Sequence, residues 1–202
     1  METLLSFVVA DGVLCLADSN INHSIVKMKE DEDKIAVLDE FKLLSSAGEP
    51  GDRTQFCEFI AKNLKLYQLR NGYSLSTSAT AHFIRNELAT ALRRNPYNVN
   101  LLVAGYDEKT GPAVYYMDYL ASLQKLDFGC HGYAAYFLLG LLDRLHHKDM
   151  SYEEGVELMH KCCEELQTRF LVGGKYTLKY ISKDGIQVVP FKVGDRKKNN
   201  QP

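Results

Sequence analysis

The chain of 202 residues lacks the sequence features of a secreted, membrane-spanning or nucleic-acid-binding protein. Its formal net charge is −2, so there is no excess of basic side chains to attract nucleic acid or an anionic membrane surface. The longest apolar run, YAAYFLLGLL, has about half the residues that a helix needs to span a bilayer. The first residues show neither the basic stretch nor the small-residue cleavage pattern of a secretory signal. These absences predict a soluble intracellular protein with no nucleic-acid partner and no membrane partner.

The cysteines and histidines also lack the spacings that disulfide and metal sites require. The five cysteines are odd in number and contain no C-x-x-C pair, which indicates free thiols in a reducing compartment. His160, Cys162 and Cys163 lie close in sequence, but zinc needs four converging ligands, and adjacent residues on a helix point about 100° apart. The segment 48–52, GEPGD, lacks the Gly-Lys-Ser/Thr ending of a phosphate-binding loop. We therefore expect no metal ion, no nucleotide and no other cofactor.

What the chain does contain is a series of short apolar strands joined in hairpins. The first pair, Thr3–Val9 and Val13–Ala17, is separated by Asp11-Gly12, a dipeptide that suits the positive φ of a tight turn. Three further hairpins follow: Ile35–Leu38 with Phe41–Ser46, Val99–Tyr106 with Ala113–Met117 and a third strand at Ser122–Leu126, and Tyr176–Ile181 with Ile186–Val189. Hairpins predict antiparallel sheets, and nearly continuous apolar strands predict sheets that are covered on both faces.

Two pairs of helices separate these hairpins. Apolar residues recur at helical spacing over Gly51–Leu69, and Ser76 is placed to cap a second helix that ends before Pro96. The segment 132–145 is apolar nearly all round, so we expect its helix to be covered on several sides. Ser151 begins a capping-box pattern at the start of the last helix. The order of hairpins and helix pairs predicts an α+β fold, a four-layer α-β-β-α sandwich of two antiparallel sheets flanked by helix pairs.

The length of the chain fits a single domain with a sizeable core. No repeat, low-complexity block or linker interrupts residues 1–192, which we interpret as that domain. The last ten residues, 193–202, are polar and basic without periodicity, so they predict a mobile tail. An arm that grips a neighbouring chain is the alternative interpretation of the tail.

Several stretches resemble the β-type subunits of the proteasome, which belong to the N-terminal-nucleophile hydrolases. They are GVLCLADS, DKIAVLDEFKLLSSAGEPGD, LYQLRNGYSLS, NVNLLVAGYDEKTGPAVYYMDYLA and HGYAAYFLLGLLDR. The resemblance runs from about Leu4 to Val189 and is strongest to the subunit at the fourth position of the β ring. It implies the N-terminal-nucleophile hydrolase fold and, as partners, the other α- and β-type subunits in stacked seven-membered rings. It also implies a role in degrading tagged proteins delivered by a regulatory particle, in the cytoplasm and nucleus.

The resemblance implies only part of a catalytic site. Active members of the family use an N-terminal threonine as nucleophile, supported by a lysine, an aspartate and a glycine N–H that donates to the oxyanion. Asp18, Lys34 and Gly48 match the aspartate, lysine and glycine positions. The position of the threonine nucleophile holds Glu2, and Thr3 lies one residue later, inside the first predicted strand.

Further positions of the family's site also differ. Tyr133 stands where the family has a serine, and Phe170 and Gly173 stand where it has an aspartate and a second serine. Losing several members of such a site together costs orders of magnitude in rate. We therefore predict a non-catalytic, structural β subunit of the proteasome core particle. Asp18 and Lys34 are then expected to form a buried ion pair that holds the strand ends together.

Two alternatives from other classes stay open. The first is an active threonine hydrolase that exposes Thr3 by processing, because the mechanism needs the nucleophile's own free amine as its base. The second is a free-standing regulatory module on the same fold, which would exist in the cell as a monomer or a small homo-oligomer.

Overall fold

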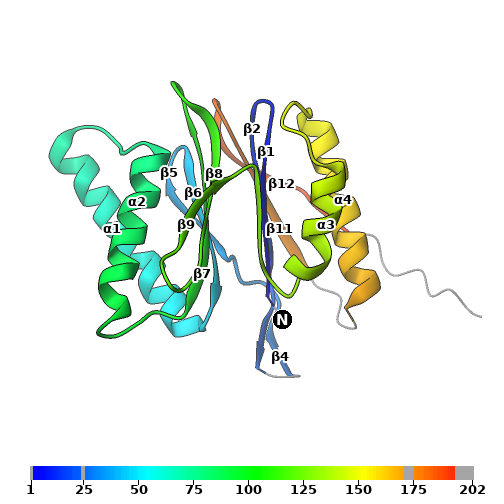
Figure 1. Cartoon of the computed structure of the whole chain (residues 1–202), viewed down its shortest axis with the longest axis horizontal. Helices are drawn as coiled ribbons and strands as arrows, with labels where there is room; N and C mark the ends of the chain where they lie inside the picture. The colour runs from blue at the N-terminus through cyan, green and yellow to red at the C-terminus, as the bar shows by residue number, and fades with distance from the viewer. Residues whose placement is uncertain (1, 24–25, 171–174, 194–202) are drawn as a thin grey trace, which may run out of the picture.

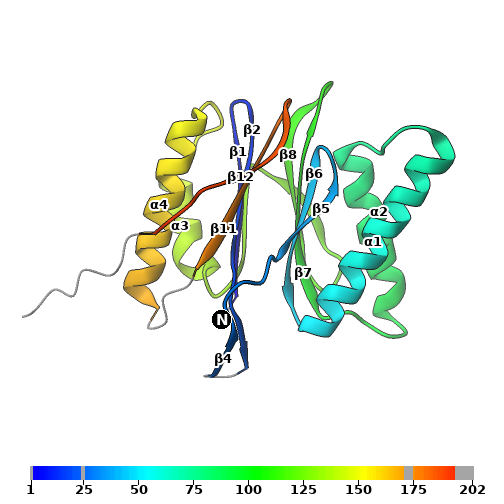
Figure 2. The ribbon, with the colours of Figure 1, turned by 180° about the vertical axis from the view of Figure 1, so that it is seen from behind.

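The computed structural model describes residues 2–23, 26–170 and 175–193. Two five-stranded antiparallel sheets pack face to face, and a pair of helices covers the outer face of each (Figures 1 and 2). Helices α1 (Pro50–Asn71) and α2 (Thr77–Leu92) form one outer layer. Helices α3 (Ala135–Leu145) and α4 (Tyr152–Arg169) form the other. This arrangement confirms the predicted four-layer α-β-β-α sandwich.

The strands of each sheet follow a simple order. The first sheet has the order β10-β1-β2-β11-β12, formed by Phe128–Gly132, Thr3–Val9, Gly12–Asp18, Tyr176–Ser182 and Gly185–Val189. The second has the order β5-β6-β7-β8-β9, formed by Ile35–Asp39, Lys42–Gly48, Val99–Asp107, Gly111–Met117 and Leu123–Leu126. A separate two-stranded sheet pairs β3 (Ile21–His23) with β4 (Val26–Lys29). The predicted hairpins are all present, with ends that differ by one or two residues.

Three strands were not predicted, namely β3, β4 and β10. The sequence prediction begins the third helix at Gly132, whereas the chain remains extended as β10 to that residue and α3 begins at Ala135. The sequence of β10, FGCHG, has little β propensity of its own. It is a strand because it pairs with β1, with Leu5 opposite Cys130, and such long-range pairing overrides weak local preference.

Most of the core lies in three apolar layers that follow the four-layer order. Between the sheets, Leu4 and Val13 of one sheet meet Leu102 and Val114 of the other, all completely buried. The remaining layers pack each helix pair onto its sheet. Burial of this kind stabilises a fold by about 25 cal/mol per Å² of apolar surface removed from water.

Helix α3 differs from the sequence prediction in how much of it is covered. Leu138 and Leu142 are completely buried, whereas Tyr136 is 84% exposed and Leu139 is 43% exposed. The prediction that this helix is covered on several sides is therefore wrong for the single chain. The sheet and α4 cover one side of α3, and the described part of the chain places no further layer beyond it (Figure 1).

The predicted helix caps are confirmed. The Ser76 hydroxyl accepts a hydrogen bond from the backbone N–H of Ala79, and Ser151 with Glu154 forms a complete capping box. At the end of α1, Gly72 takes φ 78°, a left-handed conformation that favours glycine. These contacts satisfy backbone groups that have no partner within a helix.

The C-terminal segment returns to α4 after β12 (Figure 2). The Phe191 ring stacks on His160 with 4.3 Å between ring centroids. Val193, the first residue of the predicted tail, packs partly buried against the core beside α4. Residues 194–202, the rest of that tail, lie outside the described residues.

Candidate functional site

The residues matched to the family's site converge where the open ends of two hairpins meet. Glu2 precedes β1 and Asp18 ends β2, and these strand ends are adjacent because β1 and β2 pair antiparallel. Lys34 precedes β5 and Gly48 ends β6, the corresponding ends of a hairpin in the second sheet. The N-terminus marks this end of the sandwich in Figure 1. Two sheets thus contribute to one small polar cluster.

Asp18 and Lys34 form the centre of this cluster. Lys34 Nζ lies 2.9 Å from Asp18 Oδ2, and the two side chains are 1% and 6% exposed. Asp18 Oδ1 accepts a hydrogen bond of 2.7 Å from the backbone N–H of Thr3. The predicted buried ion pair is confirmed by this geometry. Removing one member of such a pair leaves an uncompensated buried charge, which is strongly destabilising.

Glu2 adds a second carboxylate to the same lysine. Its Oε2 accepts a hydrogen bond of 2.6 Å from the backbone N–H of Gly48, and its Oε1 lies 3.4 Å from Lys34 Nζ. Gly48 N–H is the donor that the family resemblance assigns to the oxyanion. The side chain of Glu2 therefore occupies the backbone donor of Gly48.

Two glycines allow the backbone to come this close. Gly48 has φ 133°, and a Cβ there would lie 2.1 Å from the carbonyl oxygen of Asn98. Gly132 has φ 81°, and a Cβ there would lie 2.0 Å from the carbonyl oxygen of Glu2. The sequence interpretation identified Gly48 and gave no role to Gly132. The only signal for Gly132 was its place in the HGY stretch shared with the family.

Thr3 is built into the fold as a strand residue. It lies opposite Gly132 in the pairing of β1 with β10, and its side chain is buried. Its nitrogen is a peptide amide that donates to Asp18. This environment gives Thr3 neither the free amine nor the exposed hydroxyl of an N-terminal nucleophile.

Two of the other substituted positions hold aromatic side chains. Tyr133 is 61% exposed and follows directly after β10. Phe170 follows α4 as its C-cap residue and makes an edge-on ring contact with Phe137, with 5.5 Å between centroids. Gly173 lies outside the described residues. An apolar ring at position 170 cannot supply the carboxylate that the family has there.

Two hollows flank the cluster. One, of about 290 Å³, is lined by residues that include Glu2, Asn20, Gly48 and Arg53. The other, of about 220 Å³, is lined by residues that include Lys34, Arg53 and Cys57. Burial raises the pKa of the Cys57 thiol, so this group is protonated and a poor nucleophile at neutral pH.

His131 neighbours Gly132 and is buried between the sheets. Its ring stacks on Tyr116 with 4.1 Å between centroids, and its Nε2 lies 3.0 Å from the carbonyl oxygen of Leu101. Burial lowers the pKa of His131 to about 4. The imidazole is therefore neutral at neutral pH, and it packs the sandwich next to the cluster.

The residues considered for a metal site do not converge on one. Cys162 and Cys163 of α4 are both completely buried in the core, and His160 stacks on Phe191. Burial raises the pKa of the Cys162 thiol to about 12. Within residues 2–23, 26–170 and 175–193, no group of three or more His, Cys, Asp and Glu side chains could hold a metal ion. Among the described helices, none has the length and apolar character needed to cross a membrane.

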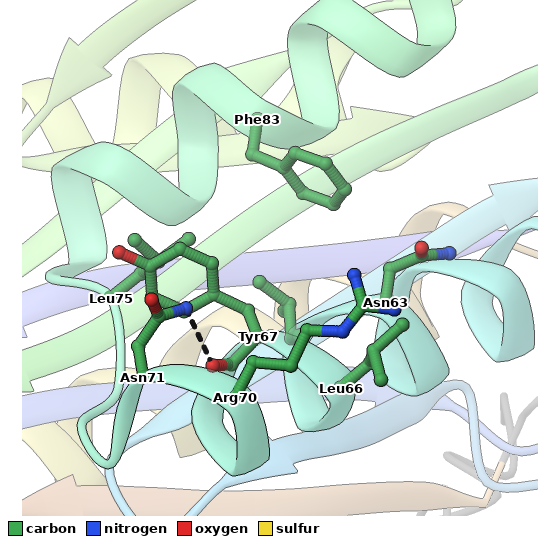
Figure 3. Close-up of a pocket in the computed structure, with 8 residues that line it drawn as sticks. Asn63, Leu66, Tyr67, Arg70, Asn71, Leu75 and Phe83 are labelled. Atoms are coloured by element: carbon green, nitrogen blue, oxygen red, sulfur yellow. Dashed lines mark hydrogen bonds between the residues drawn. The ribbon is translucent and has the colours of Figure 1, made fainter.

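A larger groove of about 430 Å³ lies between α1 and α2, in the outer layer beyond the second sheet. Figure 3 shows Phe83 of α2 facing Tyr67 and Leu66 of α1, with Arg70 between them. The Asn71 side chain donates a hydrogen bond of 2.9 Å to the Tyr67 carbonyl, which holds the end of α1. The groove is lined by apolar and aromatic side chains together with Asn63, Arg70 and Asn71.

Comparison with known proteins identifies the family. A family model described as "Proteasome subunit" matches residues 1–181. The chain belongs to the proteasome subunit family. Proteasome subunit beta type-2 of Dictyostelium discoideum is 66% identical over 194 residues, which cover 95% of this chain and 98% of that protein. Proteasome subunit beta type-2 of Oryza sativa subsp. japonica is 50% identical over 186 residues, covering 92% of this chain and 88% of that protein.

The proteasome similarity extends across distant organisms. Proteasome subunit beta type-4 of Saccharomyces cerevisiae is 39% identical over 192 residues, which cover 94% of this chain and 97% of that protein. The resemblance recognised from the sequence is thus confirmed, together with the N-terminal-nucleophile hydrolase fold of the proteasome family.

Proposed function

We propose that this proteasome-family chain is a non-catalytic, structural β subunit of the proteasome core particle. The observation that carries the proposal is the hydrogen bond of 2.6 Å from the Gly48 N–H to the Glu2 carboxylate. It puts a carboxylate at the donor where an active member of the family would stabilise its reaction intermediate. Asp18, Lys34 and Gly48 are then vestigial site positions that serve the fold.

The chemistry of Glu2 supports this role. An N-terminal nucleophile needs a hydroxyl that attacks and a free amine that takes its proton. Removing Met1 would leave Glu2 at the terminus, and its carboxylate already accepts from Gly48 and contacts Lys34. A carboxylate in this place supplies neither the hydroxyl nor an empty position for a developing oxyanion.

The alternative in which Thr3 becomes the nucleophile requires a cut between Glu2 and Thr3. The side chain of Glu2 is held by Gly48 and Lys34, and its carbonyl lies against Gly132. After such a cut, Thr3 would still be paired with Gly132 inside the sheet, one residue beyond the family's nucleophile position. The geometry therefore favours an uncut chain.

A covalent probe tests this proposal on the assembled particle. A peptide epoxyketone reacts with both the hydroxyl and the free amine of an N-terminal threonine, so it marks active subunits. After treatment and digestion, we expect adducts on other subunits and none on this chain, whose first peptide begins at Met1 or Glu2. An adduct on Thr3, or a mature terminus at Thr3, overturns the proposal.

We also propose that the chain assembles with other α- and β-type subunits in stacked seven-membered rings. The exposed apolar side chains of α3 support this, because Tyr136 and Leu139 stand on a helix whose sequence is apolar nearly all round. Exposed apolar patches of this kind mark protein–protein contacts. The groove between α1 and α2, with Leu69 and Tyr73 exposed close by, offers a second such surface.

A mass measurement separates this assembly from a free-standing regulatory module. The tagged chain would be purified separately from cytoplasmic and nuclear fractions, and its complex mass and partners determined. We expect a particle of many different subunits in both fractions. A monomer or a small homo-oligomer contradicts the structural role and favours the regulatory module.

A further inference from the structure

The Gly48 N–H and the Lys34 ammonium both contact the carboxylate of Glu2. We propose that these two donors form a carboxylate-binding site of which Glu2 is the built-in ligand, so that Glu2 latches the N-terminus across the two sheets. This latch deepens the proposed silent role, because it rests on Glu2 remaining in the chain.

The two carboxylate oxygens of Glu2 contact different groups. Oε2 of Glu2 accepts from Gly48 at 2.6 Å, and Oε1 faces Lys34 at 3.4 Å. Oε2 thus has a hydrogen-bond donor at the end of β6, and Oε1 has a cation just before β5. A hydrogen bond to an ionised acceptor at this distance is of the short, charge-assisted kind. The side chain is therefore fixed by two separate contacts.

The two ends of the Lys34–Glu2 contact differ in their exposure to water. Lys34 is 1% exposed and already paired with Asp18, whereas the Glu2 side chain is 30% exposed. The cation thus lies between two carboxylates, one buried and one at the surface of the cluster. Water can solvate the outer carboxylate, so its removal would leave a site that small anions from solution can reach.

The hydrogen bond between Glu2 and Gly48 joins the two sheets. Glu2 leads into β1 of the first sheet, whereas Gly48 ends β6 of the second sheet. A hydrogen bond between them ties the two sheets together at the strand ends, where the chain begins. Gly132 supports the tie from β10, because its missing side chain leaves room for the Glu2 carbonyl.

The adjacent hollow of about 290 Å³ gives a small carboxylate from solution room to bind in place of the Glu2 side chain. Shortening residue 2 to glycine would enlarge this hollow and leave Gly48 N–H and Lys34 without their outer ligand. Acetate is a small carboxylate that carries the same two oxygens. The site should therefore accept acetate in Glu2→Gly particles and ignore it in wild-type particles, where Glu2 already fills it.

Hydrogen–deuterium exchange on assembled particles tests the latch. The variant is Glu2→Gly, and the matched control is Glu108→Gln, which removes an exposed carboxylate from the turn between β7 and β8. Peptides that contain Gly48 and Thr3 are followed in sodium acetate and in sodium chloride of equal ionic strength. Losing one charge-assisted hydrogen bond should speed exchange at Gly48 about tenfold.

We expect acetate to restore slow exchange in Glu2→Gly particles and chloride to leave it fast. Neither salt should change exchange in wild-type or Glu108→Gln particles. If Gly48 exchanges as slowly in Glu2→Gly as in wild type, the latch is absent. If acetate and chloride act alike on the variant, the two donors are not a carboxylate site.

A second variant keeps the test decisive if Glu2→Gly does not assemble. Glu2→Gln keeps the length of the side chain and one carbonyl oxygen but loses the charge that faces Lys34. We expect exchange at Gly48 between that of wild type and that of a free amide, and equal exchange in Glu2→Gln and wild type would overturn the latch. An epoxyketone adduct on Thr3 would defeat the silent role, whereas unchanged exchange at Gly48 without an adduct would defeat the latch alone.

Discussion

Asp18 and Lys34 meet at 2.9 Å although Asp18 ends a strand of one sheet and Lys34 leads into a strand of the other. The pair is therefore a bond between the halves of the sandwich and not a contact within one hairpin. With both side chains almost fully buried, neither charge can be solvated when its partner is lost.

Lys34→Met should consequently impair folding and assembly. It leaves the Asp18 carboxylate buried without its cation, at a cost of about 3–5 kcal/mol. We expect a strong drop in the fraction of chain that enters full-size particles, measured at a series of growth temperatures. Lys62→Met, which breaks the exposed pair with Glu58, is the control and should assemble normally. Equal assembly of the two variants would contradict the structural role of the pair.

Glu2→Thr tests whether the nucleophile alone is missing. Removal of Met1 by the cell's aminopeptidase would leave a terminal threonine beside Lys34 and Gly48. We expect peptide hydrolysis lower by a factor of about 10³ or more than that of an active subunit, because Tyr133 and Phe170 replace supporting groups. The assay uses particles whose other active subunits are inactivated. Glu2→Val is the control, and turnover clearly above it would show that the remaining site suffices.

Gly132→Ala should be far more damaging than an ordinary glycine substitution. The new Cβ would lie 2.0 Å from the Glu2 carbonyl oxygen, at a φ of 81° that a side chain disfavours. We expect a loss of about 1–3 kcal/mol in stability and a displaced N-terminus. The thermal midpoint of purified particles gives the comparison with Gly51→Ala, where a Cβ meets nothing within 4 Å. Similar midpoints for both variants would argue against a close approach at Gly132.

His131 should make the particle sensitive to acid. Burial lowers the pKa of His131 from 6.5 to about 4 in the folded protein. Between these values the unfolded chain binds a proton that the folded chain does not, so stability falls as the pH drops from about 6.5 to about 4. The loss from this residue is about 3 kcal/mol in total, and above pH 6.5 it contributes no pH dependence.

Thermal melting of particles across this pH range measures the effect. His131→Gln removes the titrating ring and keeps a donor for the Leu101 carbonyl. We expect the variant to lose less stability than wild type on acidification, whatever its stability at pH 7. Parallel pH profiles for the two proteins would rule out His131 as the source.

The exposed face of α3 yields a prediction about assembly. Tyr136 is 84% exposed on a helix with a large apolar surface. Tyr136→Glu should leave the chain able to fold, because the side chain supports no core, yet exclude it from full-size particles. Native electrophoresis of cell extracts compares it with Tyr136→Phe, which should assemble as wild type. Normal assembly of Tyr136→Glu would remove this face from the interfaces.

Local patterns in the sequence were enough to predict most of the fold. Short apolar runs and tight-turn dipeptides such as Asp11-Gly12 located the hairpins, and Ser76 and Ser151 located helix starts. The strand β10 was missed because its residues prefer no particular structure and become a strand only by pairing with β1. The coverage of α3 was misjudged because an apolar sequence pattern indicates which helix faces need a packing partner. It does not indicate whether that partner belongs to the same chain, and the single chain covers only one side of α3.

The sequence indicated which residues form the candidate site, but it did not indicate which contacts they make with one another. Family spacing placed Glu2 at the nucleophile position and matched Asp18, Lys34 and Gly48 to the remaining site. The hydrogen bond between Glu2 and Gly48 depends on how two sheets stack, which no local pattern specifies. The role of Gly132 depends in the same way on the path of β1 beside β10.

The opposite surroundings of the two described chain ends bear on how the protein can be labelled. The described chain begins at Glu2 in the charged cluster, so a fluorescent protein or affinity handle fused to this end would start next to that cluster. After β12 the chain instead runs over α4, where Phe191 rests on His160 at the outer surface (Figure 2). Reporters for imaging or purification therefore belong at the C-terminal side, where they leave the Glu2 contacts intact.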